Sequence, residues 1–173
     1  MEGAGSNRVS PAARTGLIVA ATTLILDQAS KLWLLHGFDL GRRGLVKVLP
    51  FFDLILAWNT GISYGMFSDS GPTGQVLLVA FKIVAVIALT VWMVRAETRL
   101  ATIALGLIIG GAIGNAIDRF AYGAVVDFAL LHAEIGGKTY NWYVFNLADV
   151  AIVAGVAALL YDSFVTPDAA KRP

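Results

Sequence analysis

Four long apolar segments constrain this chain more than any other feature of its sequence. They cover residues 16–35, 76–94, 100–117 and 146–165. An α-helix rises about 1.5 Å per residue, so about 20 residues cross the hydrocarbon layer of a membrane. With 57% hydrophobic and 14% charged residues and a mean hydropathy of +0.72, the chain is predicted to be an integral membrane protein with four transmembrane helices.

The first segment has a competing interpretation as a cleaved signal peptide, because Arg14 precedes an apolar core. A cleavage site after Ala29 would put Asp27 where a small residue is required, and the apolar run resumes at residues 32–35. We therefore interpret residues 16–35 as a transmembrane helix.

The remaining segments predict a topology and one domain spanning residues 1–173. Residues 1–15 and 166–173 are expected to be cytoplasmic tails, and residues 36–74 and 120–145 to be extracytoplasmic. The arginine-containing turn at residues 95–99 favours the cytoplasm by the positive-inside rule, although Arg42, Arg43 and Lys47 in the first outer segment weaken the count. The predicted fold is an all-α membrane protein with a small β part on the outer membrane surface.

The two outer segments carry signals for strands and turns. Residues 45–58 are rich in apolar and aromatic residues, with a break at Pro50, and predict short strands. Residues 68–72 predict a loop, residues 124–128 an extended piece, and residues 136–138 a turn. A small sheet and a loop at the membrane surface are therefore expected.

Composition excludes several classes of function. A net charge of +1 argues against a nucleic-acid partner. The chain has no cysteine, which excludes disulfides, thiol nucleophiles and cysteine-ligated metals. Its two histidines, His36 and His132, are far apart and outside a His-Glu-x-x-His pattern, so a zinc protease is not favoured and no metal or cofactor is expected.

Charged and amide residues interrupt two of the apolar segments. Asp27 and Lys31 are four residues apart and can pair on one helix face. They form either an interfacial pair in which Lys31 extends toward the membrane surface, or part of a polar site there. At the outer end of the third segment and just beyond it, Asn115, Asp118 and Arg119 are spaced to share one helix face. Glycines at every fourth residue from 106 to 114 predict close helix packing on the neighbouring face.

Two aspartates are predicted to meet at the outer surface. Asp149 and Asn146 stand three residues apart at the start of the fourth segment, and Asp127 follows the third. Two close carboxylates share a proton, so one can activate water while the other polarises a peptide carbonyl. The alternative is that they are separate caps or interface residues, with Asp149 stabilising a helix dipole. The sequence does not say which aspartate is acid and which is base.

A serine nucleophile is a further candidate. Gly61-Ile62-Ser63-Tyr64-Gly65 fits the Gly-x-Ser-x-Gly pattern, which requires a strand–turn–helix context and a histidine partner. A loop is expected after Gly65 and no histidine is well placed, so Ser63 is not favoured.

Five motifs, in order, carry a resemblance to a known family. They are Asp27-Gln28-x-x-Lys31, Asn59-Thr60-Gly61, Gly110-Gly111-Ala112-Ile113-Gly114-Asn115-Ala116-Ile117-Asp118-Arg119, Val125-Val126-Asp127-Phe128 and Phe145-Asn146-Leu147-Ala148-Asp149. Each motif alone is weak, but together they resemble the bacterial lipoprotein signal peptidases (signal peptidase II) over nearly the whole chain apart from its tails.

The resemblance implies an aspartyl endopeptidase of the bacterial inner membrane, with its active site near the outer, periplasmic surface. Such enzymes cut the signal peptide from prolipoproteins just before a cysteine that carries diacylglycerol. The expected partners are these substrates and membrane lipid, and a monomer is expected. Asp127 and Asp149 match the catalytic pair. The residues expected to bind substrate or shape the site are Asp27, Lys31, Asn59, Gly61, Asn115, Asp118, Arg119 and Asn146. Arg119 would either pair with Asp118 or bind the substrate backbone.

Two other classes of protein compete with a protease. A proton-coupled transporter would use Asp27 or Lys82 as an intramembrane relay, but such folds usually have inverted repeats and midplane sites. A structural membrane scaffold would leave the clustered asparagines, aspartates and arginine without a role.

Overall fold

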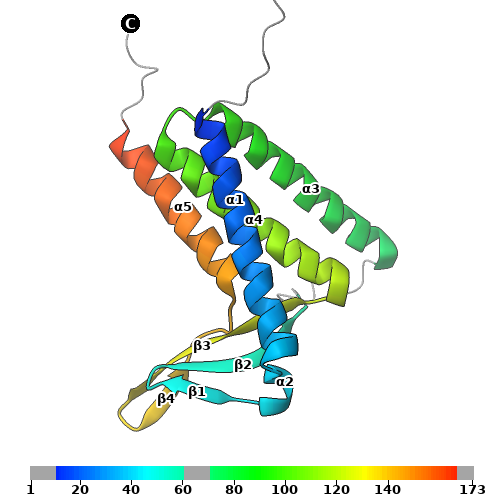
Figure 1. Ribbon diagram of the computed structural model, residues 1–173, viewed down its shortest axis with the longest axis vertical. Coiled ribbons are helices and arrows are strands. Elements are labelled where there is room, and N and C mark those ends of the chain that lie inside the picture. The colour runs from blue at the N-terminus through cyan, green and yellow to red at the C-terminus, as the bar shows by residue number, and fades with distance from the viewer. Residues whose placement is uncertain (1–10, 61–70, 167–173) are drawn as a thin grey trace, which may run out of the picture.

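The chain folds into a bundle of long helices with a small sheet at one end. The computed structural model describes residues 11–60 and 71–166, with residues 71–82 as backbone only. Its long helices are α1 (Pro11–Leu32), α3 (Gly71–Arg95), α4 (Arg99–Tyr122) and α5 (Leu147–Val165). Figure 1 shows α1, α4 and α5 packed together, while α3 diverges from them toward the sheet end.

Three helical stretches of the described residues are long and apolar enough to cross a membrane: Pro11–Gly37, Arg99–Tyr122 and Leu147–Val165. In α3 the apolar part with described side chains, Ile83–Arg95, is shorter. The mostly helical membrane fold is therefore confirmed, whereas the count of four transmembrane helices stays a prediction.

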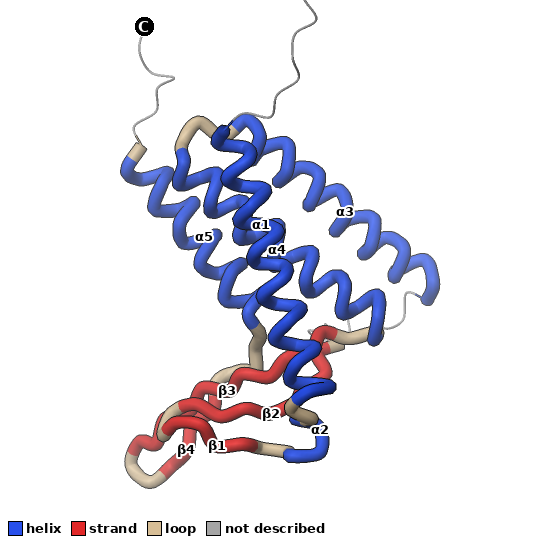
Figure 2. The backbone as a smooth tube through the Cα atoms, in the orientation of Figure 1, coloured by secondary structure: helices blue, strands red, loops and turns tan. Residues whose placement is uncertain are grey.

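The predicted β part is a four-stranded antiparallel sheet in the order β1-β2-β3-β4. Its strands are β1 (Val46–Leu49), β2 (Phe52–Asn59), β3 (Val125–Ile135) and β4 (Lys138–Asn141). The break predicted at Pro50 lies between β1 and β2. The turn predicted at residues 136–138 joins β3 to β4, and Gly136 and Gly137 take φ angles of 60° and 74°, which favour glycine. Figure 2 shows this sheet lying across the end of the helices.

Some element boundaries differ from the predictions. The third helix continues to Tyr122 rather than ending near Ile117, so Asp118 and Arg119 lie within α4. The second long helix, α3, begins at Gly71, so the loop predicted at residues 68–72 is wrong for its last two positions. Residues 61–70 lie outside the described part of the chain. The helix accepts Pro72 because its first turn needs no backbone donor there.

Two short helical segments were predicted only in part, because residues 33–35 belong to the first predicted helix but residues 36–43 were expected outside it. A π-helix over Trp33–Gly37 extends α1, and α2 covers only Leu40–Arg43. Segments of one turn are too short to show a hydrophobic period. They matter because Leu34 and Leu40 are buried against Phe128 of β3 in a second hydrophobic core. This core holds the sheet against the end of α1.

The glycine face of α4 packs directly on α1, as predicted. A Cβ atom at Gly106 would lie 2.6 Å from the backbone oxygen of Gly16, and one at Gly110 would lie 2.5 Å from that of Ala20. At Gly114 it would lie 2.5 Å from Oδ2 of Asp27. Because these glycines have no side chains, the backbones of α1 and α4 can approach closely, as can the polar groups at the end of the two helices near the sheet.

We predict that Gly110→Val destabilises the bundle, because the new side chain would overlap the backbone of α1. Overpacking of this kind reduces the free energy of unfolding by about 1–3 kcal/mol. Thermal unfolding in detergent measures the change. Ala21→Val, at an exposed position on α1, is the matched control and should stay within about 0.5 kcal/mol of the parent. Equal stability of the two variants would contradict the close packing.

Candidate active site

A buried lysine lies at the centre of the polar residues. The Nζ atom of Lys31 is 2.8 Å from Oδ2 of Asp27 and 2.7 Å from Oδ2 of Asp118. It also donates a hydrogen bond of 3.1 Å to Oδ1 of Asn115. The side chain of Lys31 is only 2% exposed, so the interpretation in which it extends to the membrane surface is wrong. Its pairing with Asp27 is confirmed.

The two carboxylates around Lys31 tie together four elements of the fold. Oδ1 of Asp27 accepts a hydrogen bond of 2.9 Å from the backbone N–H of Ala148, in the first turn of α5. Oδ2 of Asp118 accepts one of 3.1 Å from the N–H of Val126 in β3. Both aspartates are buried, and these donors satisfy oxygens that would otherwise lose the hydrogen bonds of water.

Gln28 is a site residue that the sequence prediction missed. Its Nε2 atom lies 2.9 Å from Oδ1 of Asp118, 3.1 Å from the backbone oxygen of Gly114 and 3.2 Å from Oδ2 of Asp27. A glutamine beside an aspartate is common on helices and does not by itself indicate a functional site. Only its position within the Asp27 motif could have suggested this role.

Asn146 combines two roles, as a helix cap and as a bridge between the two candidate catalytic aspartates. Its Oδ1 accepts a hydrogen bond of 3.0 Å from the backbone N–H of Asp149, whose Oδ2 accepts one of 3.2 Å from the N–H of Asn146. This reciprocal pair is a capping box at the start of α5. The Nδ2 atom of Asn146 also donates to Oδ1 of Asp127 at 2.6 Å. Asp149 is therefore a capping residue, as one alternative held, but the two aspartates are not separate.

Asn115 completes the network on the side of α4. Its Nδ2 atom donates to Oδ1 of Asp149 at 2.9 Å. Its Oδ1 atom accepts from Lys31 and, at 3.2 Å, from Nδ2 of Asn146. One amide thus joins the lysine cluster to the start of α5.

Asp127 lies in β3, opposite Ala57 of β2, and its side chain is buried. Its Oδ2 atom accepts a hydrogen bond of 3.0 Å from Nδ2 of Asn59, at the end of β2. Burial raises the pKa of Asp127, and the charge of Asp149 adds to the increase. Hydrogen bonds from Asn59 and Asn146, together with the charge of Lys31, act in the opposite direction without cancelling it. Burial thus shifts the balance at this position toward the neutral acid, relative to an exposed aspartic acid.

Arg119 does not pair with Asp118, because Asp118 faces Lys31 instead. The Nη1 atom of Arg119 donates to the backbone oxygen of Asn115 at 3.3 Å, and its side chain is partly exposed. Of the other candidates, Gly61 and Ser63 lie outside the described residues, as does the side chain of Lys82.

The described geometry can support acid–base chemistry. A buried carboxyl group whose pKa is raised and a more accessible carboxylate both contact Asn146, the first through its side-chain amide and the second through its backbone N–H. Such a pair can share one proton and divide the roles of acid and base between its members.

A family model described as "Signal peptidase (SPase) II" matches residues 19–165. The chain belongs to the signal peptidase II family. This confirms the family inferred from the five motifs and makes the chain a member of a family of peptidases.

Curated relatives support the same family. A protein of Rhodopseudomonas palustris (strain ATCC BAA-98 / CGA009) named "Lipoprotein signal peptidase" is 72% identical over 92% of this chain and 98% of its own. One of the same name from Nitrobacter hamburgensis is 69% identical, with the same coverage.

A solved structure supports the fold of this signal peptidase II. A bacterial membrane enzyme determined by the in meso method at 1.9 Å resolution matches with a TM-score of 0.72. That protein is 26% identical to this chain, and the match covers 89% of this chain and 94% of the other.

We predict that Asn146→Ala destabilises the protein by roughly 2 kcal/mol or more. The substitution removes a helix cap, worth about 1 kcal/mol, and leaves a buried oxygen of Asp127 without its donor, at a cost of about 1–3 kcal/mol. Chemical or thermal unfolding measures the loss. Asn141→Ala, at an exposed position in β4, is the control and should have little effect. A variant as stable as this control would show that the hydrogen bonds of Asn146 do not contribute to the stability of the protein.

Proposed function

We propose that this signal peptidase II is an aspartyl endopeptidase embedded in the bacterial inner membrane. Its substrates are diacylglyceryl-modified prolipoproteins, and it cuts the signal peptide off just before the lipidated cysteine. The observation that carries the proposal is the contact of Asn146 with both Asp127 and Asp149. Membership of the signal peptidase II family and the names of its relatives support the substrate class.

In the proposed reaction the aspartate pair holds one proton. The ionised carboxylate accepts a proton from a water molecule, which attacks the scissile carbonyl carbon. The protonated partner donates a hydrogen bond to the carbonyl oxygen, where negative charge develops, and a proton then passes to the leaving amine. Water is consumed and a peptide bond is broken without a covalent intermediate or a cofactor.

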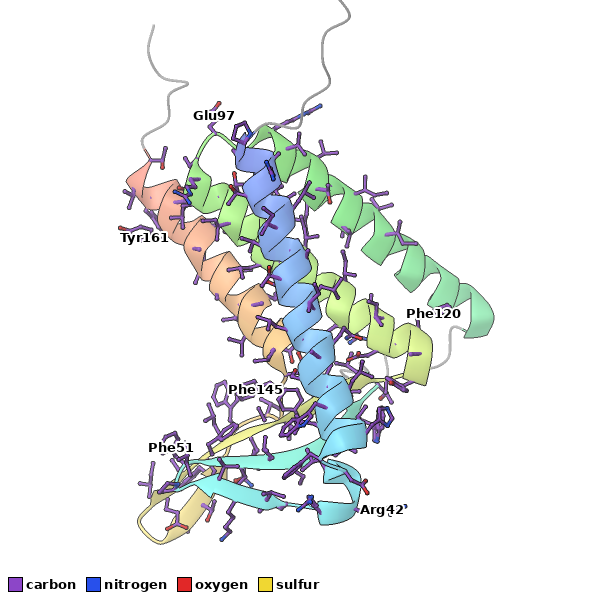
Figure 3. The ribbon with its side chains drawn as sticks, in the orientation of Figure 1. Arg42, Phe51, Glu97, Phe120, Phe145 and Tyr161 are labelled. Atoms are coloured by element: carbon purple, nitrogen blue, oxygen red, sulfur yellow. The ribbon has the colours of Figure 1, made fainter. Side chains whose placement is uncertain are left out.

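The proposed topology has four transmembrane helices, cytoplasmic tails and the sheet at the periplasmic surface, in one domain that acts as a monomer. The start of α1, the end of α5 and the arginine-containing turn between α3 and α4 lie together at the end of the bundle away from the sheet (Figure 1). Figure 3 shows Glu97 of that turn and Tyr161 at this end, with Phe145 near the sheet. Cationic turns favour the cytoplasm.

Exposed aromatic side chains support the placement of the sheet at the membrane surface. Trp142 is 68% exposed and Tyr143 is 84% exposed, next to the sheet. Tryptophan and tyrosine favour the interface between lipid and water. A substrate held there can keep its acyl chains in lipid while its backbone meets Asn59, Arg119 and the aspartate pair.

Among the described residues a transporter has no comparable support. Asp27, one of its two candidate relays, is fully buried and bound to Lys31, Gln28 and the backbone of Ala148. The side chain of Lys82, the other candidate, lies outside the described residues. A carboxylate held in this way is structural, because a relay requires a group that exchanges protons with water.

We predict that Asp127→Asn and Asp149→Asn each reduce cleavage at least about a hundredfold, because asparagine keeps the shape but cannot act as acid or base. The substrate is a purified diacylglyceryl-modified prolipoprotein, and mass spectrometry of the product locates the cut before the modified cysteine. Asp39→Asn, at the half-exposed partner of Arg42, is the matched control and should cleave normally. If either active-site variant folds and cleaves normally, that aspartate is not catalytic, and Asp118 and Ser63 become the candidates.

We further predict a bell-shaped dependence of kcat/KM on pH. Burial raises the pKa of Asp127, so its proton is retained at higher pH than in an ordinary aspartic acid. Activity therefore declines on the alkaline side as pH rises through that pKa, and on the acidic side as the pair takes up a second proton. A profile that only rises with pH, as for a single unprotonated base, would contradict a shared proton.

A further inference from the structure

Lys31 and Asn146 together determine how the amide of Asn115 is turned. A lysine ammonium group only donates hydrogen bonds, so the atom of Asn115 that faces it must be the carbonyl oxygen. Lys31 Nζ lies 3.1 Å from this Oδ1 atom, and the amide nitrogen at the other side lies 2.9 Å from Oδ1 of Asp149. Asn115 therefore presents an N–H donor to Asp149, and its oxygen is held by two donors, Nζ of Lys31 and, at 3.2 Å, Nδ2 of Asn146.

The second oxygen of Asp149 also faces a donor that cannot reverse. It accepts the backbone N–H of Asn146, within the capping box of α5. Asp149 lies in the first turn of this helix, where the helix dipole favours a negative charge. Asp127 also accepts two hydrogen bonds, from Asn59 and Asn146, but it is buried in a strand, whereas Asp149 lies at the start of a helix and is more accessible.

We propose that Lys31 is a positioning residue that acts through Asn115, holding Asp149 as the general base and leaving the shared proton on Asp127, the general acid. This inference rests on the proposed function, in which the two aspartates are the catalytic pair. It adds which of them has which role, and it names a group that supports the difference.

The effect works through the direction of hydrogen bonds rather than through net charge. Lys31 contributes one positive charge, but Asp27 and Asp118 both lie within 2.8 Å of its Nζ atom. The three groups together are therefore not a source of positive charge. The charged groups of the described residues that surround the Asn115–Asp149 contact are Asp27, Lys31, Asp118, Arg119 and Asp127. Only Lys31 bonds to the carbonyl oxygen of Asn115 as a charged donor.

Lys31→Met tests the proposal, because methionine has a similar length but cannot donate. Without the ammonium group the oxygen of Asn115 keeps only the donor from Asn146, so the amide is held less firmly with its N–H toward Asp149. We expect kcat to fall about tenfold or more, the effect of one hydrogen bond to a charged group. We also expect the acidic limb of the pH profile of kcat/KM to move to higher pH. KM should change little, because Lys31 is buried. Lys138→Met, at an exposed position in β4, is the matched control.

A second variant covers the case in which Lys31→Met does not fold, since it leaves Asp27 and Asp118 without their cation. Asn115→Asp keeps the ion pairs of Lys31, but it puts a carboxylate oxygen where Asp149 receives its N–H donor. The two carboxylates would then hold a proton between them, and the acidic limb should again move to higher pH. Thermal unfolding and gel filtration establish that each variant is folded.

The outcomes separate this proposal from the proposed function. A folded Lys31→Met or Asn115→Asp enzyme whose activity falls equally at every pH, with an unmoved acidic limb, would show that Lys31 is merely structural. Asp127→Asn and Asp149→Asn are measured in parallel. If both are inactive and the limb does not move, the positioning role alone is overturned. If either cleaves normally, the catalytic pair itself is wrong.

Discussion

The arrangement of this protein depends on one buried ammonium group. Removing a charge from water costs several kcal/mol, and a buried ion pair offsets that cost only with good geometry and satisfied partners. Lys31 meets this condition with three acceptors, which come from its own helix and from α4. The helices must therefore approach closely at this depth. Gly114 permits it, because a Cβ atom there would lie 2.5 Å from Oδ2 of Asp27.

The same network places the start of α5. Asp27 accepts the N–H of Ala148, and Asn146 caps the helix while its amide reaches Asp127. A shift of α5 by one residue would break all of these contacts together. Structural stability and the geometry of the candidate pair thus rest on the same few side chains. This explains why so many polar groups lie buried in an otherwise apolar bundle.

Local features of the fold could be predicted because their cause lies in neighbouring residues. The pairing of Asp27 with Lys31 follows from one helical turn, and the strand break at Pro50 and the turn at Gly136–Gly137 follow from backbone chemistry. The one-turn helix α2 and the extension of α4 to Tyr122 were missed, since neither changes the hydrophobic pattern. The site residues themselves were found through motifs of a family, which identify positions without explaining their contacts.

The sequence by itself determined the membrane class, most helices and strands, the family and the two candidate aspartates. Only the tertiary structure decided which groups the buried polar side chains bond to. Lys31 bonds to Asn115 84 residues away, and Asp27 to Ala148 121 residues away. The tertiary structure also pairs Asp118 with Lys31 rather than with the adjacent Arg119. The physical reason is that the hydrogen bonds of a buried polar group are chosen by whichever elements pack around it, and no local period encodes that choice.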